Sequence, residues 1–250
     1  MQTIVKRRAD APPGFFEAEA AGLAWLAAAG GVGTVGVAAV SPGRIELERI
    51  DETRPDPAAA EAFGAALART HAAGARAFGA PPDGWDGPMF IGRRPLPAAS
   101  DRSWGVFYAR DRVLPYLELA EEVGDTTAAE GRLVRRALDI VAAGAFDDDE
   151  PPSRLHGDLW NGNVLWSSRG VVLIDPAAHG GHRETDLAML ALFGCPHWDF
   201  VIGGYLGQHR LDAQWPQRVA LHQLHPLMVH GVLFGADYPH RAVELARRYR

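Results

Sequence analysis

The chain is poor in cysteine and has no long apolar stretch. Its single cysteine, Cys195, excludes a disulfide bond within the 250 residues, so a reducing compartment, the cytoplasm, is the location we expect. No apolar run reaches the roughly 18 residues that cross a bilayer. The N-terminus also lacks the apolar segment of a secretion signal. These absences argue against a membrane-spanning or disulfide-stabilised protein.

Lysine and asparagine are also scarce. Only one of the 25 Lys and Arg residues is a lysine, Lys6, and the only two asparagines, Asn161 and Asn163, lie in one short loop. The chain is otherwise rich in Ala, Arg and Gly. We therefore treat the positions that keep Lys and Asn as candidates for chemistry that requires these side chains.

The composition is that of a folded, acidic protein. Hydrophobic residues make up 47% and charged residues 22%, which allows a sizeable core in one or two domains. The net charge of −6 argues against a dedicated nucleic-acid-binding protein. It does not exclude a nucleotide site, because a phosphate site needs only local positive charge and oriented N–H groups.

Apolar periodicity and turn residues predict two unequal parts. Residues 1–52 are predicted to form a small sheet with one helix, with strands at 3–7, 35–40 and 44–50 and the helix at 13–29. Residues 53–250 are predicted to be mainly helical, with one hairpin formed by residues 164–166 and 171–174. We therefore expect an α+β fold in which a β-rich N-terminal lobe precedes a larger helical lobe.

Local signals in the second part mark helix starts and loops. Asp56-Pro57 and the capping box Thr127–Glu130 each predict the start of a helix, and Ser100 predicts the cap of another. Residues 76–99 are rich in Gly and Pro, so we expect a loop there. The acidic residues 147–150 are expected to form a solvated loop.

The chemistry is concentrated between His156 and Asp175. Asp158 and Asn163 lie five positions apart in a polar loop, and Asp175 ends the hairpin that follows. Phosphoryl transfer needs a carboxylate that deprotonates the attacking hydroxyl and oxygen ligands that hold Mg²⁺ against the phosphates. Asp158 is the predicted base, Asn163 and Asp175 are the predicted metal ligands, and His156 is predicted to support the loop. The alternative is a loop in which these side chains make only turn hydrogen bonds.

A cation for the nucleotide phosphates is predicted near the N-terminus. Lys6 lies in an apolar-flanked strand, and Glu19 lies in the helix that follows. Kinases place a strand lysine on the phosphates and hold it with a helix glutamate. The alternative is a surface lysine and a solvated glutamate. Because the sole lysine stands where this mechanism requires one, we assign Lys6 and Glu19 to nucleotide binding.

These residues resemble a known family. The run His156-Gly-Asp-Leu-Trp-Asn-Gly-Asn163 is similar to the catalytic loop of aminoglycoside-phosphotransferase-like proteins. Its Asp-Leu-Trp-x-Gly-Asn form resembles the fructosamine kinase (ketosamine 3-kinase) family. The likeness extends to Phe16–Leu23, Asp175–Gly194 and His222–Gly235, so it runs along nearly the whole chain.

The resemblance implies a two-lobed, protein-kinase-like fold that binds ATP and Mg²⁺ between its lobes. It also implies a ketosamine, the adduct of a sugar with an amine, as the substrate. Main-chain groups of Glu48 and Ile50 are expected to face adenine. Trp160 is expected to contact the sugar, with a loop-anchoring role as the alternative. His182 and Glu184 follow Asp175 and are expected to touch substrate or to support the loop, and the sequence does not decide between these roles.

One part of the family pattern is missing from the sequence. The family carries a Gly-rich hairpin ahead of the lysine strand, whereas only five residues precede Lys6, so we expect the sheet to lack this hairpin. Three hypotheses follow: a ketosamine kinase, a kinase for another hydroxylated amine (aminoglycoside, choline or hexosamine), or a catalytically weak nucleotide-binding module. The sequence leaves the oligomeric state open.

The remaining candidates are interpreted as structural. His222, His225 and His230 lie in an apolar helical stretch that carries no carboxylate or cysteine partner for a metal. We therefore expect core or hydrogen-bonded histidines there. Cys195 has no base placed beside it by the sequence, so we expect a packed side chain and not a nucleophile.

Overall fold

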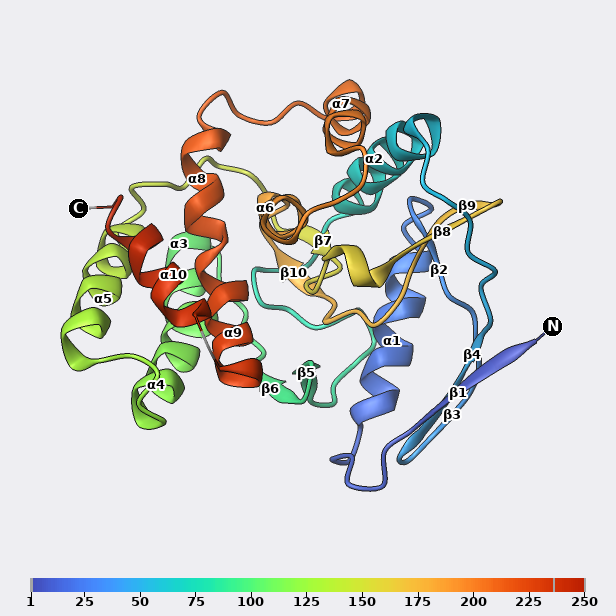
Figure 1. Cartoon of the computed structure of the whole chain (residues 1–250), viewed down its shortest axis with the longest axis horizontal. Helices are drawn as coiled ribbons and strands as arrows, with labels where there is room; N and C mark the ends of the chain where they lie inside the picture. The colour runs from blue at the N-terminus through green and yellow to red at the C-terminus, as the bar shows by residue number, and fades with distance from the viewer. Residues whose placement is uncertain (1, 236, 250) are drawn as a thin grey trace.

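The structure, a computed structural model, describes residues 2–235 and 237–249. The chain folds into two lobes, with a small sheet and one helix on the right of Figure 1 and a larger, mainly helical lobe on the left. This arrangement confirms the predicted α+β class. None of the helices in the described part of the chain is long and apolar enough to cross a membrane.

The sheet of the small lobe consists of β1 (Thr3–Arg7), β3 (Val37–Ser41) and β4 (Arg44–Glu48) in the order β1-β4-β3. All neighbours are antiparallel, and Lys6 pairs with Ile45. Helix α1 (Phe15–Ala27) packs against this sheet through apolar side chains that include Phe16 and Leu23. The strand predicted at 3–7 is confirmed, and β1 forms one edge of the described sheet.

A second, short sheet ties the lobes together. Strand β2 (Gly33–Thr34) runs parallel to β9 (Gly170–Leu173), which pairs with β8 (Val164–Ser167) in the predicted hairpin. The hairpin that ends near Asp175 is therefore hydrogen-bonded to a segment of the first 50 residues. A boundary at residue 52 stays a prediction.

The large lobe is built from helices around an apolar core that includes Leu117, Val134 and Leu227. Its helices are α2 (Pro57–Ala72), α3 (Trp104–Phe107), the π-helical turn η1 (Tyr108–Val113), α4 (Leu114–Glu122), α5 (Ala128–Ala142), α6 (Glu184–Phe193), α7 (Trp198–Gln208), α8 (Trp215–His222), α9 (Leu224–Phe234) and α10 (Tyr238–Ala246). The Asp56 cap and the Thr127–Glu130 capping box are both present, as predicted.

Three local predictions were wrong. Residues 76–99 contain a hairpin, β5 (Met89–Ile91) and β6 (Arg94–Leu96), which the Gly- and Pro-rich composition hid. Ser103, not Ser100, caps the helix that starts at Trp104, because its hydroxyl accepts the Val106 N–H at 3.3 Å. The acidic run is not simply solvated, since the Asp148 side chain is 9% exposed and pairs with His182 and Arg218.

Candidate active site

The catalytic loop starts where β7 (Ser153–Leu155), paired with β10 (His179–Gly181), ends. Asn163 closes the loop in the short 3₁₀ turn Asn161–Asn163. Its Nδ2 donates to the Asp158 carbonyl at 2.8 Å and to Asp158 Oδ2 at 3.1 Å. The amide therefore aims the carboxylate, and Asn163 Oδ1 remains available to a cation.

His156 and Asp186 hold this loop through hydrogen bonds. His156 Nε2 donates to the Ile174 carbonyl at 2.9 Å, and its Nδ1 accepts the Asp158 N–H at 3.2 Å. The buried Asp186 accepts the N–H groups of His156 at 2.8 Å and Gly157 at 3.0 Å. These hydrogen bonds hold the main chain from His156 to Asp158, and the supporting role of His156 stays a prediction.

The electrostatics suit a base that works near neutral pH. Burial raises the pKa of the Asp158 carboxyl to about 7, against the opposing effect of the Asn163 hydrogen bond. Burial lowers the pKa of His156, which favours the neutral ring that the two hydrogen bonds require. A proton acceptor is most effective when its pKa lies close to the working pH.

Lys6 reaches across from the small lobe. Its ammonium lies 2.9 Å from Glu19 Oε1 on α1 and is also hydrogen-bonded to Asp175 Oδ1. Burial alone would lower the pKa of Lys6, but the two carboxylates outweigh it and raise that pKa. Asp175 adopts a left-handed backbone conformation, with φ of 54°, directly after the β8–β9 hairpin. The sole lysine therefore contacts both the helix glutamate and Asp175.

These groups share one cleft of about 720 Å³ between the lobes. Lys6, Glu19, Asp158, Asn163 and Asp175 all line it. Trp160 lines it as well and is 39% exposed, so its ring is open to the cleft.

Two predicted nucleotide contacts lie elsewhere in the small lobe. The N–H of Glu48 donates to the Gly36 carbonyl at 2.7 Å, and its carboxylate pairs with Arg169 at 2.7 Å. Ile50 packs beside the apolar core of the small lobe. Neither residue is among those that line the cleft. Their role opposite adenine stays a prediction.

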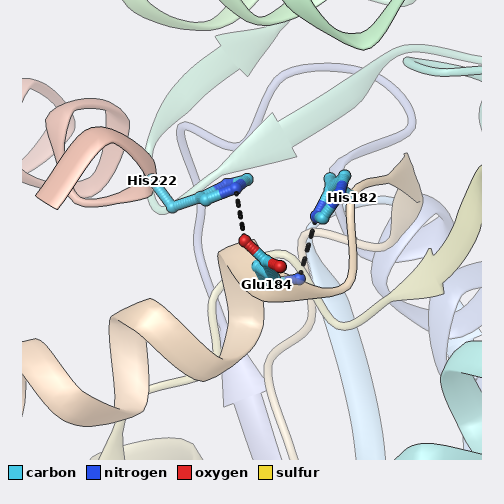
Figure 2. Close-up of side chains that lie close together, drawn as sticks. All are labelled: His182, Glu184 and His222. Atoms are coloured by element: carbon cyan, nitrogen blue, oxygen red, sulfur yellow. Dashed lines mark hydrogen bonds and ion pairs between the residues drawn. The ribbon is translucent and has the colours of Figure 1, made fainter. Parts of the chain in front are cut away.

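His182 and Glu184 are buried inside the large lobe and do not line the cleft. Figure 2 shows them beside His222, whose Nε2 lies 3.4 Å from Glu184 Oε2. The ligand atoms of the three side chains lie within 4.8 Å of one another. The stretch of sequence around His222 carries no carboxylate. In the structure Glu184, from another helix, lies beside its ring.

A guanidinium already occupies this cluster. Arg218 Nε and Nη2 donate to the two Glu184 oxygens at 2.9 and 2.5 Å, and Nη2 also reaches Asp148 at 2.7 Å. His182 Nε2 lies 3.0 Å from the same Asp148 carboxylate. We interpret the cluster as an ion-pair network that ties α6 and α8 to the acidic loop. This geometry favours the loop-support role over substrate contact for His182 and Glu184.

Sequence reasoning missed two groups of residues in and around the cleft. Asp186 received no role, although a carboxylate two residues after Glu184 in a mostly apolar helix was a usable signal. The second group is an aromatic wall from distant parts of the chain, namely Phe193, His230, Phe234 and Tyr238. No local pattern joins these four positions, so only the fold reveals them.

Comparison with known proteins identifies a family. The fructosamine kinase family model matches residues 2–249. An Enterococcus faecium protein named as a ketoamine kinase is 30% identical over 249 residues, which cover 98% of this chain and 87% of that protein. A Thermobifida fusca crystal structure named as a fructosamine-3-kinase is 47% identical, with a TM-score of 0.90 over 99% of this chain and 85% of that one.

The fold is shared more widely. Choline kinase LicA from Streptococcus pneumoniae superposes with a TM-score of 0.67 at 16% identity, over 99% of this chain and 86% of that one. This likeness confirms the two-lobed, protein-kinase-like fold. The family match covers almost the whole chain and includes every residue of the cleft described above. The chain therefore belongs to the fructosamine kinase family.

Proposed function

We propose that the chain transfers the γ-phosphate of ATP to a sugar hydroxyl of a ketosamine. The observation that carries the proposal is the meeting of Lys6, Glu19, Asp158, Asn163 and Asp175 in one cleft. Membership in this kinase family implies the use of a nucleotide and a divalent metal ion. We propose ATP and Mg²⁺ for those two ligands and the cytoplasm as the place of work.

The residues divide the transfer step between them. Asp158 would accept the proton of the attacking hydroxyl, because its carboxylate is oriented by Asn163 and lines the cleft. Lys6, held by Glu19, would neutralise charge on the nucleotide phosphates. Trp160 would present its open ring to the sugar.

The donor set fits Mg²⁺. Asn163 offers a carboxamide oxygen and Asp175 a carboxylate, and Mg²⁺ prefers oxygen ligands of this kind. When bound, the ion would neutralise charge that develops on the transferred phosphoryl group. In the structure one Asp175 oxygen is hydrogen-bonded to Lys6, so this aspartate would join the cation of the small lobe to the metal.

The cleft disfavours an aminoglycoside as acceptor. Among its described lining residues, the only carboxylates are Glu19, Asp158 and Asp175, and each has a role in the transfer step. An aminoglycoside carries several ammonium groups, which would need further carboxylates. Arg93 adds a positive charge to the lining instead. A catalytically weak module is also disfavoured, because the five residues proposed for the transfer step all line this cleft.

The test is ADP release by the purified chain with Mg-ATP. Ketosamines of fructose and ribulose would be compared with choline, a hexosamine and an aminoglycoside. Turnover confined to ketosamines is the expected result. Turnover confined to another acceptor would keep the transfer mechanism and refute the substrate. Failure of every acceptor to stimulate ADP release would contradict the proposal as a whole.

A further inference from the structure

The cleft extends beyond the transfer residues to the aromatic wall. Phe193 is the last residue of α6, Phe234 is the last residue of α9, and Tyr238 is the first residue of α10. His230 lies one helical turn before Phe234. All four residues line the cleft, and the transfer step described above uses none of them.

His230 lies at the centre of the wall. Its ring centroid is 4.4 Å from that of Phe193, 5.3 Å from Tyr238 and 5.4 Å from Phe234. The Phe234 side chain is 68% exposed, which leaves a large apolar ring without cover at the cleft. Exposed aromatic surface that lines a cavity commonly marks a ligand contact.

The neutral ring of His230 offers Nε2 as a hydrogen-bond acceptor. Its Nδ1 donates to the Pro226 carbonyl at 2.8 Å, so the proton of the neutral ring is on Nδ1. Burial lowers the pKa of His230, which keeps the ring neutral. Nε2 therefore carries a lone pair, and a ligand that completes this site must offer an N–H or O–H donor.

Helix ends add a negative potential. Both α6 and α9 end at the wall, at Phe193 and Phe234, and the carboxyl end of a helix carries a partial negative charge. The amino end of α10 also lies here, but it follows Asp237, whose carboxylate offsets the partial positive charge. The two helix ends therefore add negative potential at the wall, and the positive charge of Arg93, which also lines the cleft, acts against it.

We propose that the aromatic wall binds the protonated secondary amine of a ketosamine and the first carbon atoms of its amine-derived substituent. This inference rests on the proposed function and adds the feature of the substrate that the cleft recognises. Ring faces attract a cation, His230 Nε2 accepts an ammonium N–H, and two helix ends supply negative potential. A free ketose lacks the ammonium group and would forgo all three interactions.

The direct test compares two acceptors of one shape. The first is an N-alkyl 1-amino-1-deoxyfructose, which is protonated near neutral pH, and the second is the matching 1-O-alkyl ether, which is uncharged. The value of kcat/KM for each is measured by ADP release. We expect the amine to be preferred by about tenfold or more, from a cation–π contact and a charge-assisted hydrogen bond.

Two variants separate the contributions. Phe234→Leu keeps an apolar side chain but removes the ring, and His230→Phe keeps an aromatic ring but removes the acceptor. Each variant should reduce the ratio of kcat/KM for the amine to that for the ether by about 3- to 10-fold, because KM for the amine rises. The value of kcat and the KM for ATP should change little. Phe200→Leu is the matched control, because Phe200 is a 47% exposed aromatic residue of α7 that does not line the cleft.

The outcomes are distinct. Equal kcat/KM for amine and ether, or a preference unchanged in both Phe234→Leu and His230→Phe, would overturn the ammonium site and leave the kinase activity in place. Phe234→Leu should fold normally, since its side chain is mostly exposed, and an unchanged thermal midpoint would verify this. Turnover of neither compound by the unaltered chain would contradict the proposed function itself.

Discussion

At the scale of single residues, hydrogen bonds hold the proposed base Asp158 in one orientation. Its carboxylate is held by Asn163 Nδ2 at 3.1 Å, and its own N–H is held by His156. A carboxamide in place of the carboxylate would preserve these contacts and the shape of the cleft. It would remove only the proton acceptor.

Asp158→Asn should therefore lower kcat by at least about 10²-fold while nucleotide affinity stays close to normal, because a base acts on the transition state. Steady-state kinetics and a nucleotide titration measure the two quantities. If Asp158→Asn kept full turnover, Asp158 would not be the base. A parallel loss of nucleotide binding would indicate a misfolded cleft.

Asp186 gives a prediction about pH. Burial opposes its ionisation, but hydrogen bonds from His71 and from the N–H of Gly157 outweigh this effect and lower the pKa of Asp186. The folded pKa therefore lies below the unfolded value of about 3.9. The carboxylate contributes stability above about pH 4 that is lost as the pH falls through the folded pKa.

Asp186→Asn should lower the free energy of unfolding by about 3 kcal/mol near neutral pH, because it leaves buried N–H groups poorly paired. Urea unfolding at a series of pH values should show the difference between the unaltered chain and the variant shrinking below about pH 4. A difference that stays constant down to acid pH would show that Asp186 contributes no charge-dependent stability.

The candidate site residues were predictable where they lie close together in the sequence. His156, Asp158 and Asn163 lie within eight positions, so their spacing alone identifies the loop. Lys6 was recognisable because the chain has no other lysine. The Asp186 support was not recognised, because the main-chain N–H groups that it accepts lie 29 and 30 residues away in the sequence.

At the scale of elements, the catalytic loop depends on close contact with the segment that follows Asp175. Gly157 has a φ of 80°, and a Cβ there would lie 2.3 Å from the Ala177 carbonyl oxygen. Only glycine satisfies both the backbone conformation and this approach. The two segments that carry Asp158 and Asp175 are thus packed directly on each other.

Gly157→Ala should lower the thermal midpoint and reduce kcat by more than about tenfold, because the loop must shift away from its neighbour. Gly170→Ala is the matched control, since Gly170 also has a positive φ, of 100°, but faces open space in the β8–β9 turn. The control should therefore show only the effect of backbone strain on the thermal midpoint, with little change in kcat. Equal loss of activity in both variants would refute the role of the contact.

Elements were predictable where their signals are local. The strand at 3–7 and the Thr127–Glu130 capping box need only neighbouring residues, and both are confirmed. The β5–β6 hairpin was missed because Gly and Pro dominate its surroundings, and its strands are only three residues long. The acidic loop was misread because burial of Asp148 depends on Arg218, which lies 70 positions away.

At the scale of the whole molecule, one hydrogen bond joins the two lobes through the site. Lys6 belongs to β1 of the small lobe and Asp175 to the segment after β9, and the two side chains meet in the cleft. A metal-bound nucleotide would contact both side chains, so we expect its binding to stabilise the folded chain.

Mg-ATP at about 100 times its dissociation constant should stabilise the chain by about 2.7 kcal/mol, seen as a rise in the thermal midpoint. Asp175→Ala should remove the Mg²⁺-dependent part of this rise, because it deletes the carboxylate ligand. The same scan with ATP and a chelator provides the baseline. A full Mg²⁺-dependent shift in Asp175→Ala would place the metal on other residues.

The fold as a whole was predictable from resemblance, and the family match confirms it. The residues that form the aromatic wall of the cleft were not. Phe193, His230, Phe234 and Tyr238 come from three helices, and their convergence depends on how α6, α9 and α10 pack. The proposed ammonium site therefore depends on packing that a single sequence does not display.

The measurement that tests the central claim most directly is mass spectrometry of a ketosamine incubated with the chain and Mg-ATP, with Asp158→Asn as the blank. The account predicts that the ketosamine gains one phosphate group, in amounts that match the ADP formed, and that the blank gains almost none. ADP formed while the ketosamine stays unmodified, or an equal gain in the blank, would contradict the assignment of a ketosamine kinase that uses Asp158 as its base.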